Sequence, residues 1–324
     1  QRLENFIPRG FKDWVIIDEV QRVPELLHEI HRLIESRKYK FILTGSSPRK
    51  LRRKGPNLLA GRALTLRMHP LTAAELGNDF RLGHSLQYGQ MPSVYTQPEP
   101  KRYLEAYVKT YLDEEIRHEG LTRNLSAFTR FLEAASLSQG AVLNIASVAR
   151  ECAVERKSAE NYFSILEEIM IAYRLPIFSR KTKRRLITHC KFYFFDVGVY
   201  RTLRPLGPLD EPQEVTGVAL ETLFLQELIA LNDALGLGYK VFYWRTANGQ
   251  EVDFILYGPR GLLAFEVTKT ARIKSAMFAG LKAFLADYPQ AKVYFVYGGE
   301  RRMYEGKIQV VPAVESLKDL KKLL

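Results

Sequence analysis

The sequence lacks the features that mark secreted, membrane-spanning and zinc-binding proteins. Only two of its 324 residues are cysteine, which excludes a disulfide framework. Neither Cys152 nor Cys190 has metal-ligand neighbours at the spacing of a zinc site. No apolar run approaches the roughly 20 residues of a membrane span, and the start at Gln1 does not resemble a signal peptide. We therefore expect a cytoplasmic protein without a membrane segment.

Acidic residues are scarce in two segments of the chain. Residues 32–67 hold eleven Lys and Arg against one acid, and residues 174–204 hold nine against one. The densest basic runs lie at 49–54 and 180–185, in a chain whose formal net charge is +12. Concentrated positive charge favours polyanions, either nucleotide phosphate or a nucleic acid backbone. A solvated loop is the alternative interpretation of each run.

Carboxylates are concentrated in residues 251–269, which read as two strands joined by a turn at 258–261. This turn places Asp253 opposite Glu266, with Cβ atoms about 5 Å apart. Glu251 shares their face by the two-residue period of a strand. A hard divalent cation would relieve their repulsion, so we predict Asp253 and Glu266 as ligands of Mg²⁺ or Mn²⁺. Alternatively, they are exposed polar positions neutralised by a nearby Lys or Arg.

The opposite face of this predicted hairpin is apolar and is expected to be buried. It consists of Val252, Phe254, Leu256, Leu263, Phe265 and Val267. Upstream, a predicted helix at 217–228 carries Glu221 and precedes a strand at 240–245. Helix, strand, acidic hairpin, helix, strand is the element order of the PD-(D/E)XK nuclease fold.

Several motifs resemble those of a widespread prokaryotic family of predicted AAA-type ATPases. The nuclease-like C-terminal domain of that family resembles residues 217–267. Four motifs carry this resemblance in chain order: GxxxE on a helix at 217–221, YWR at 243–245, EVDF at 251–254 and FEV at 265–267. Residues 15–19, reading VIIDE, resemble its Walker B strand, and residues 41–47 resemble the following sensor strand. Residues 59–62 and 70–75 resemble the segment that closes the ATPase core. The resemblance covers nearly the whole chain.

The resemblance implies specific roles for residues of the first domain. Asp18 would bind Mg²⁺ through water, and Glu19 would polarise the water that attacks ATP. Thr44 or Ser46 would sense the γ-phosphate. Arg62 would act as an arginine finger in a neighbouring subunit, or else form a surface ion pair.

The phosphate-binding loop GxxxxGK[ST] is missing from the sequence. Residues 299–307 only imitate it, because Ile308 follows the lysine. In the family this loop lies upstream of the Walker B strand, so we infer that an N-terminal segment precedes Gln1 in the intact protein. Without its backbone amides and lysine, tight ATP binding and appreciable ATPase activity are not expected of this chain.

The middle of the chain reads as helical, with predicted helices at 99–118, 128–135, 144–154 and 158–170. The last two, followed by strands around a basic hairpin, resemble a winged helix-turn-helix. Its wing, residues 179–185, would follow a DNA backbone without reading sequence. The wing contacts would come from Arg180, Lys181, Lys183, Arg184 and Arg185. A role of this winged-helix module as a lid or linker is the alternative. Separately, Asp196 ends a predicted strand and is expected to cap the helix that follows it.

The sequence departs from the nuclease motif E-x-K, in which the lysine shares the face of the second acid. Thr268 stands at the matching position, and Lys269 is one residue late, which on a regular strand turns it to the opposite face. A bulge would return Lys269 to the site, and Lys274 is an alternative. Metal binding is therefore more strongly predicted than catalysis, for which Asp253, Glu266, Glu221 and Lys269 are the candidates.

These patterns predict an α/β protein with three parts. We expect a partial P-loop AAA-type domain at 1–76, a helical and winged-helix region at 77–205, and a mixed-sheet restriction-endonuclease-like domain at 206–324. Three functions stay open. They are a nucleic-acid or protein interaction module, a Mg²⁺- or Mn²⁺-dependent DNA nuclease, and a fragment of a longer active ATPase, with the oligomeric state left open.

Overall fold

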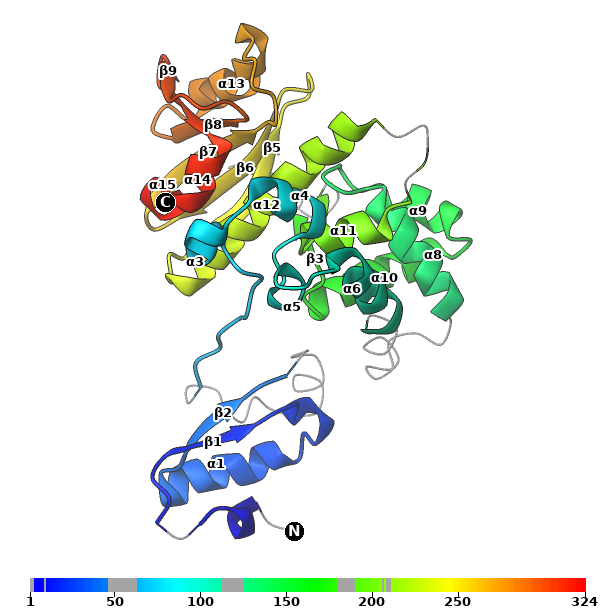
Figure 1. Cartoon of the computed structure of the whole chain (residues 1–324), viewed down its shortest axis with the longest axis vertical. Helices are drawn as coiled ribbons and strands as arrows, with labels where there is room; N and C mark the ends of the chain where they lie inside the picture. Colours follow the sequence, from blue (N-terminus) through cyan, green and yellow to red (C-terminus); the bar gives the residue numbers. More distant parts are fainter. Residues whose placement is uncertain are drawn as a thin grey trace. The chain divides into compact units, whose positions relative to one another are not determined.

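The computed structural model describes residues 3–8, 10–45, 63–111, 125–179, 190–205, 207 and 211–324. The chain divides into two compact units (Figure 1). One comprises Gln1–Thr65 with Ser164–Met170, and the other comprises Leu66–Phe163 with Ile171–Leu324.

The first unit contains a parallel strand pair joined by a helix. β1 (Trp14–Ile17) pairs with β2 (Lys40–Leu43) from Trp14↔Lys40 to Ile17↔Leu43. Parallel strands require a crossover connection, which here runs through α1 (Leu26–Arg37), whose Ile30 and Leu33 are fully buried. Short 3-10 turns occupy η1 (Leu3–Phe6) and η2 (Val20–Arg22). Both predicted strands are confirmed.

The second unit begins with short helices. They are α3 (Ala73–Leu76), η3 (Gly77–Asp79), α4 (Leu82–Tyr88), α5 (Pro92–Tyr95), α6 (Pro100–Ala106) and the π-helical turn η4 (Tyr107–Tyr111). Thr72 and Glu75 form a capping box that starts α3. Proline at the first position of α5 and of α6 suits a helix start, where no backbone donor is needed.

Further helices and a small hairpin follow these elements. α8 (Leu125–Ser136), α9 (Ile145–Glu151) and α10 (Arg156–Glu168) occupy the predicted helical segments. β3 (Ala172–Leu175) pairs antiparallel with β4 (Lys191–Phe194). α11 (Val197–Leu203) then starts at Asp196, whose carboxylate accepts from the backbone amides of Gly198 and Val199. The predicted capping role of Asp196 is therefore confirmed.

A six-stranded mixed sheet forms the C-terminal part. Its strands are β5 (Lys240–Arg245), β6 (Glu251–Gly258), β7 (Gly261–Val267), β8 (Lys292–Tyr297), β9 (Met303–Glu305) and β10 (Ile308–Pro312), ordered β5-β6-β7-β8-β10-β9. β5, β6 and β7 form an antiparallel meander, and β8 lies parallel to β7. η5 (Ser275–Phe278) and α13 (Ala279–Asp287) make that crossover. Residues 299–307, which imitate a phosphate loop in sequence, instead form β9 and its turn into β10.

Helices cover both faces of this sheet (Figure 1). The long helix α12 (Pro212–Ala234) packs Leu223 and Phe224 against Phe254 and Phe265. On the other side, α13 packs with Ile255, Leu262 and Ala264. α14 (Ala313–Lys318) and α15 (Leu320–Leu323) add to the α12 side.

The division of the hairpin into one apolar and one polar face is wrong in two respects. The face that carries Ile255 and Ala264 is also buried, because α13 covers it. Val252, expected beside Phe254, instead packs with Trp244 and the α13 side. The register between β5 and β6 shifts between Phe242 and Trp244, and such a bulge breaks the two-residue alternation of a strand.

Within the described residues, α12 is long and apolar enough to span a membrane by length and composition alone. Its residues Val215–Ala234 have a mean hydropathy of 1.2, so the expectation that no segment reaches this length was wrong. Two-thirds of that stretch is buried within the protein (67%). This burial is the usual situation of a helix in the core of a domain, so α12 alone is weak evidence for a membrane segment.

Candidate functional site

The hairpin of β6 and β7 has the predicted register. Pairing runs from Gly258↔Gly261 to Phe254↔Phe265, one position short of Asp253 and Glu266, whose direct opposition stays a prediction. Beside that position, Asp253 Oδ2 accepts a hydrogen bond of 2.9 Å from the backbone amide of Val267. Asp253 is only 7% exposed, so it is not an exposed polar position of the hairpin.

A lysine that the sequence analysis did not select lies against these acids. Lys191, at the start of β4, is 3% exposed. Its Nζ lies 3.3 Å from Asp253 Oδ1 and also contacts the carboxylate of Glu251. The ammonium sits 5.7 Å from the ring centroid of Tyr243, within the range of a cation–π contact. We call Lys191, Glu221, Glu251, Asp253 and Glu266 the acid–lysine cluster.

The charge of Lys191 is stabilised by its surroundings. Burial lowers the pKa of Lys191, but Tyr193 and the carboxylates of Asp253, Glu221 and Glu251 outweigh that effect and raise this pKa well above its ordinary value. The ammonium therefore stays charged. Asp253 is neutralised by a nearby lysine, as the alternative interpretation of the sequence predicts, although it is buried rather than exposed.

Glu221 reaches the cluster from α12. Tyr193 Oη donates a hydrogen bond of 3.3 Å to Glu221 Oε2. Burial and the nearby charge of Asp253 raise the pKa of Glu221 to about 8. Glu221 is thus brought near Asp253, as the sequence predicts.

Glu266 is the least compensated carboxyl group. Burial, and then the charge of Asp253, raise the pKa of Glu266 well above its ordinary value. Its Oε2 is buried and has no hydrogen-bond partner within the described part of the chain. A buried polar atom without a partner is costly, so the acid–lysine cluster retains capacity to bind a donor.

Thr268, at the lysine position of the E-x-K motif, and the alternative lysines Lys269 and Lys274 lie outside the acid–lysine cluster. The Thr268 amide donates 2.8 Å to Val296 O, past the end of β7. Lys269 and Lys274 are both exposed and lie in the segment between β7 and η5. Lys191 is therefore the cation that contacts Asp253, and Lys269 does not form such a contact within the described residues.

Oxygen donors of this kind suit Mg²⁺ or Mn²⁺, but their arrangement does not fit a metal ion. Among the described residues, no group of three or more His, Cys, Asp and Glu side chains is placed to hold one. Lys191 also occupies the space between Glu251 and Asp253. A divalent ion bound there would face an ammonium group at contact distance, which like-charge repulsion disfavours.

In the first unit, the predicted nucleotide-site residues Asp18 and Thr44 are brought together. The Thr44 hydroxyl donates to Asp18 Oδ1. Gln21 Nε2 donates to Glu19 Oε2 at 2.8 Å, and Glu19 has a φ of 53°. A non-glycine residue in this left-handed region is uncommon and is often found at functional positions. Ser46 and Arg62 lie outside the described residues.

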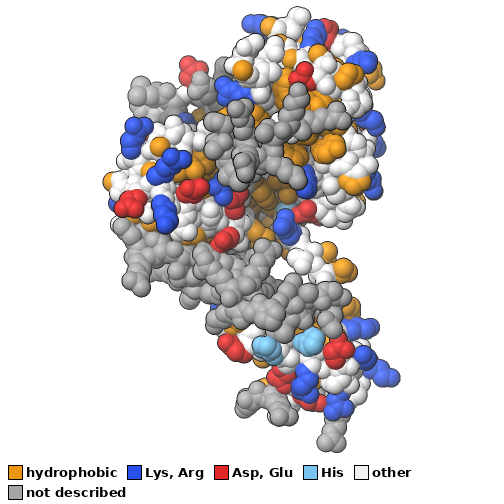
Figure 2. Space-filling model, turned by 180° about the vertical axis from the view of Figure 1, so that it is seen from behind, with side chains coloured by type: hydrophobic (Ala, Val, Ile, Leu, Met, Phe, Trp, Pro, Cys, Tyr) orange, Lys and Arg blue, Asp and Glu red, His pale blue; other side chains and the backbone are white. Residues whose placement is uncertain are grey.

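The predicted wing of the winged helix also lies outside the described residues. This applies to Arg180, Lys181, Lys183, Arg184 and Arg185, and to the basic run at 49–54. On the face drawn in Figure 2, the described Lys and Arg side chains are scattered among Asp, Glu and hydrophobic side chains. The described part of that face therefore shows no single basic patch.

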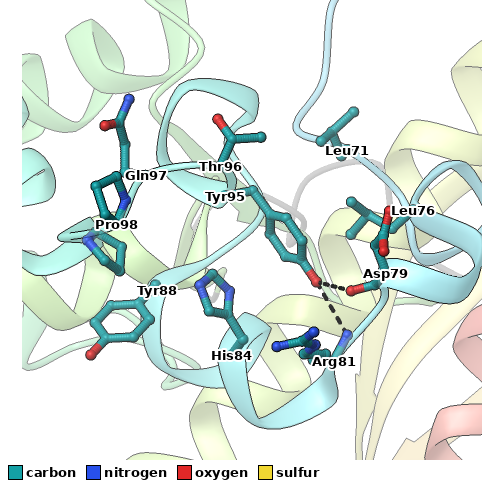
Figure 3. A pocket seen from close by; sticks show the side chains of 11 residues that line it. Leu71, Leu76, Asp79, Arg81, His84, Tyr88, Tyr95, Thr96, Gln97 and Pro98 are labelled. Carbon is teal, nitrogen blue, oxygen red and sulfur yellow. Dashed lines mark hydrogen bonds between the residues drawn. The ribbon is translucent and has the colours of Figure 1, made fainter.

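A pocket of about 630 Å³, open to solvent on one side, is lined by residues of α3 to α6 and of the segments that connect them (Figure 3). The Tyr95 hydroxyl accepts from the Arg81 amide at 3.1 Å and donates to the Asp79 carbonyl at 2.8 Å. The His84 ring lies 4.7 Å from Tyr95 and 5.2 Å from Tyr88, between ring centroids. None of the residues predicted for a site lines this pocket, so we regard the acid–lysine cluster as the principal candidate.

Comparison with known proteins divides the chain into three matched regions. Residues 2–77 match a family model described as an AAA domain. Residues 80–210 and 216–315 match two domains of unknown function, DUF8612 and DUF4143. The acid–lysine cluster therefore combines Lys191 of the second region with carboxylates of the third.

Three relatives are described as uncharacterized proteins. Proteins of Mycobacterium bovis and Mycobacterium tuberculosis are each 24% identical over 317 residues, covering 95% of this chain and 70% of each relative. A Haemophilus influenzae protein is 23% identical over 208 residues, covering 59% of this chain and 52% of its own length. Protein VC1899 of Vibrio cholerae aligns over 97% of this chain and 91% of its own, with 13% identity and a TM-score of 0.26, too low to compare folds.

The comparisons therefore support an AAA-type ATPase family for this protein through its N-terminal residues, followed by two regions that match domain families of unknown function.

Proposed function

We propose that this protein is an AAA-type ATPase-family member that binds nucleic acid through its middle region and carries a nuclease-like C-terminal region that does not cleave it. The element order α12, β5, β6, β7, α13, β8 supports the nuclease-like fold, because it is the order of PD-(D/E)XK nucleases. ATP enters this proposal only with a phosphate loop, which the 324 residues do not contain. A cytoplasmic location is part of the same proposal.

The buried Lys191 is the observation that carries the absence of cleavage. Nucleases of this fold use their carboxylates to hold a metal ion that stabilises the developing charge. Here an ammonium from β4 contacts Glu251 and lies 3.3 Å from Asp253. The acidic face is thus neutralised by the protein itself, and the lysine of the motif is replaced by Thr268.

Charge and the middle region support nucleic acid as the partner. The chain carries a net charge of +12, which favours polyanions. α9 and α10 followed by the β3–β4 pair have the order of a winged helix-turn-helix. The basic residues 180–185 fall between those two strands, where a wing would be.

Salt-dependent DNA binding tests this proposal. We expect affinity for duplex DNA, measured by fluorescence anisotropy, to fall steeply between about 50 and 200 mM salt. The double variant Arg184→Glu/Arg185→Glu should weaken binding, whereas Lys321→Glu/Lys322→Glu on α15 should not. An affinity that is independent of salt, or equally affected by both variants, would contradict the proposal.

A metal-dependent DNA nuclease is a second candidate. Glu266 Oε2, buried without a hydrogen-bond partner in the described residues, favours it because a bound cation would satisfy that oxygen. Lys191 would then replace the missing lysine of the motif. Under this candidate, Asp253→Ala abolishes metal-dependent cleavage without loss of folding.

A further inference from the structure

The charges of the acid–lysine cluster come from different parts of the chain. Lys191 lies on β4, in the region matched at 80–210, whereas Glu251 and Asp253 lie on β6, in the region matched at 216–315. The second region therefore supplies the counter-ion of the third. A fragment holding only the third region would contain these carboxylates without their cation.

Lys191 is held in place by its backbone as well as its ammonium. β4 pairs with β3 over its full length. The residues that follow β3 run beside β5. There the backbone amide of Tyr243 donates 3.1 Å to the Pro176 carbonyl, and the backbone carbonyl of Tyr243 accepts 2.6 Å from the Phe178 amide. These bonds tie the hairpin of β3 and β4 to the edge of the six-stranded sheet.

A buried glutamine adds a second connection. Gln139 Oε1 accepts from the Phe194 amide at 2.8 Å, and Gln139 Nε2 donates to the Thr222 hydroxyl at 2.9 Å. Because Phe194 ends β4 and Thr222 follows Glu221 on α12, this bridge fixes the strand of Lys191 relative to the helix of Glu221. The position of the ammonium is thus determined from two sides.

The cluster carries more acid than Lys191 alone can balance. Lys191 contacts two carboxylates, those of Glu251 and Asp253, and one further carboxyl oxygen, Glu266 Oε2, is buried without a partner in the part of the chain that the structure describes. A second cation would be attracted to this surplus. It would have to approach Glu251 and Asp253, however, which already contact Lys191.

We propose that Lys191 and a divalent cation compete for the same carboxylates, so that Lys191 acts as a built-in counter-ion which blocks metal binding. Removal of the ammonium leaves Glu251 and Asp253, the two carboxylates that it contacts, without a counter-ion, and carboxylate oxygens are donors of the type that Mg²⁺ and Mn²⁺ select. The proposal extends the proposed function, because it states why the nuclease-like site is inactive. It depends on the cluster alone and not on DNA binding.

Mn²⁺ binding to the full chain tests the proposal. Titration calorimetry should show that Lys191→Met binds Mn²⁺ at least about tenfold more tightly than the wild type, and that Lys191→Met/Asp253→Asn loses the gain. Mn²⁺ should also raise the melting temperature of Lys191→Met and leave that of the wild type unchanged. Lys269→Met, which removes an exposed lysine, is the matched control and should behave as the wild type.

Two results would overturn the proposal. The first is equal Mn²⁺ affinity in the wild type and Lys191→Met, and the second is tighter binding by the wild type, which would make Lys191 a partner of the metal. If Lys191→Met folds only with Mn²⁺, that supports the proposal. If it does not fold at all, Lys191→Met/Glu221→Gln reduces the repulsion without removing either carboxylate that Lys191 contacts, and a gain or no gain in its Mn²⁺ affinity decides.

Discussion

Lys191 and Asp253 form a buried ion pair, with 3.3 Å between Nζ and Oδ1, although they are separated by 62 positions in the sequence. The pair joins two regions that match different domain families. Its position at the hairpin that resembles a nuclease motif is the main reason for proposing that the C-terminal region does not cleave DNA. The following predictions test this account.

Replacing the buried lysine should destabilise the protein strongly. Lys191→Met keeps most of the side-chain volume but leaves Glu251 and Asp253 without their cation, and breaking a buried pair from one side typically costs about 3–5 kcal/mol. The free energy of unfolding in urea measures this cost. Lys269→Met, at an exposed position, should change it by less than about 0.5 kcal/mol. Equal losses in both variants would contradict the ion-pair role.

A second buried acid should make stability depend on pH. Glu227 is fully buried, and its Oε1 accepts 2.6 Å from the Ala73 amide. Burial raises the pKa of Glu227 from 4.5 to about 8. Between these values the folded state binds the proton more strongly than the unfolded state, so this group's contribution to stability falls as pH rises from about 4.5 to 8.

Glu227→Gln should therefore flatten the pH dependence. The amide keeps an acceptor for Ala73 but does not ionise, so the variant should gain stability relative to the wild type as pH rises, with the largest gain above about pH 8. Thermal melts from pH 5 to 9 measure the gain. The exposed Glu300→Gln serves as the control. If Glu227→Gln were instead stabilised relative to the wild type mainly at low pH, the predicted direction of the pH dependence would be wrong.

Two glycines with positive φ should respond differently to alanine. Gly89 has a φ of 74°, and a Cβ there would lie 2.1 Å from Asp196 Oδ1, whereas Gly77 has a φ of 53° and open space around it. Gly77→Ala should cost about 1 kcal/mol from backbone strain alone. Gly89→Ala should cost more, because the carboxylate that accepts from Gln90, Gly198 and Val199 must move. Equal costs in chemical denaturation would argue against this contact.

The nucleotide-site residues should not suffice for ATP hydrolysis. Thr44 contacts Asp18, and Glu19 follows β1, but the 324 residues hold no phosphate loop. We expect no steady Mg²⁺-dependent release of phosphate by this chain. The prediction would be refuted if the wild-type chain released phosphate steadily, and if Glu19→Gln abolished this release while Glu25→Gln left it unchanged.

Local patterns in the sequence predicted much of the fold. The apolar runs before Asp18 and Thr44 are β1 and β2, and the turn at 258–261 sets the register of β6 and β7. Asp196 caps α11 as predicted, since a carboxylate at a helix start has few alternatives. These features depend on neighbours in sequence, which is why periodicity and turn chemistry are sufficient to predict them.

Long-range features were not predicted. The contact of Lys191 with β6 depends on how β4 packs, and no local pattern reports that packing. A signal was present, because Lys191 begins the otherwise apolar run KFYFF and every residue of β4 is buried. A charged residue in such a strand needs a partner. Similarly, the shift of Val252 to the α13 side follows from an irregular pairing with β5.

Cleavage of plasmid and single-stranded DNA, with Mg²⁺ and with Mn²⁺, tests the central claim most directly. We predict that the intact wild-type chain binds DNA but cuts neither substrate, and that Asp253→Ala is indistinguishable from it in this assay. Metal-dependent cutting by the wild type that is lost in Asp253→Ala would contradict the claim and establish a nuclease in which Lys191 takes part.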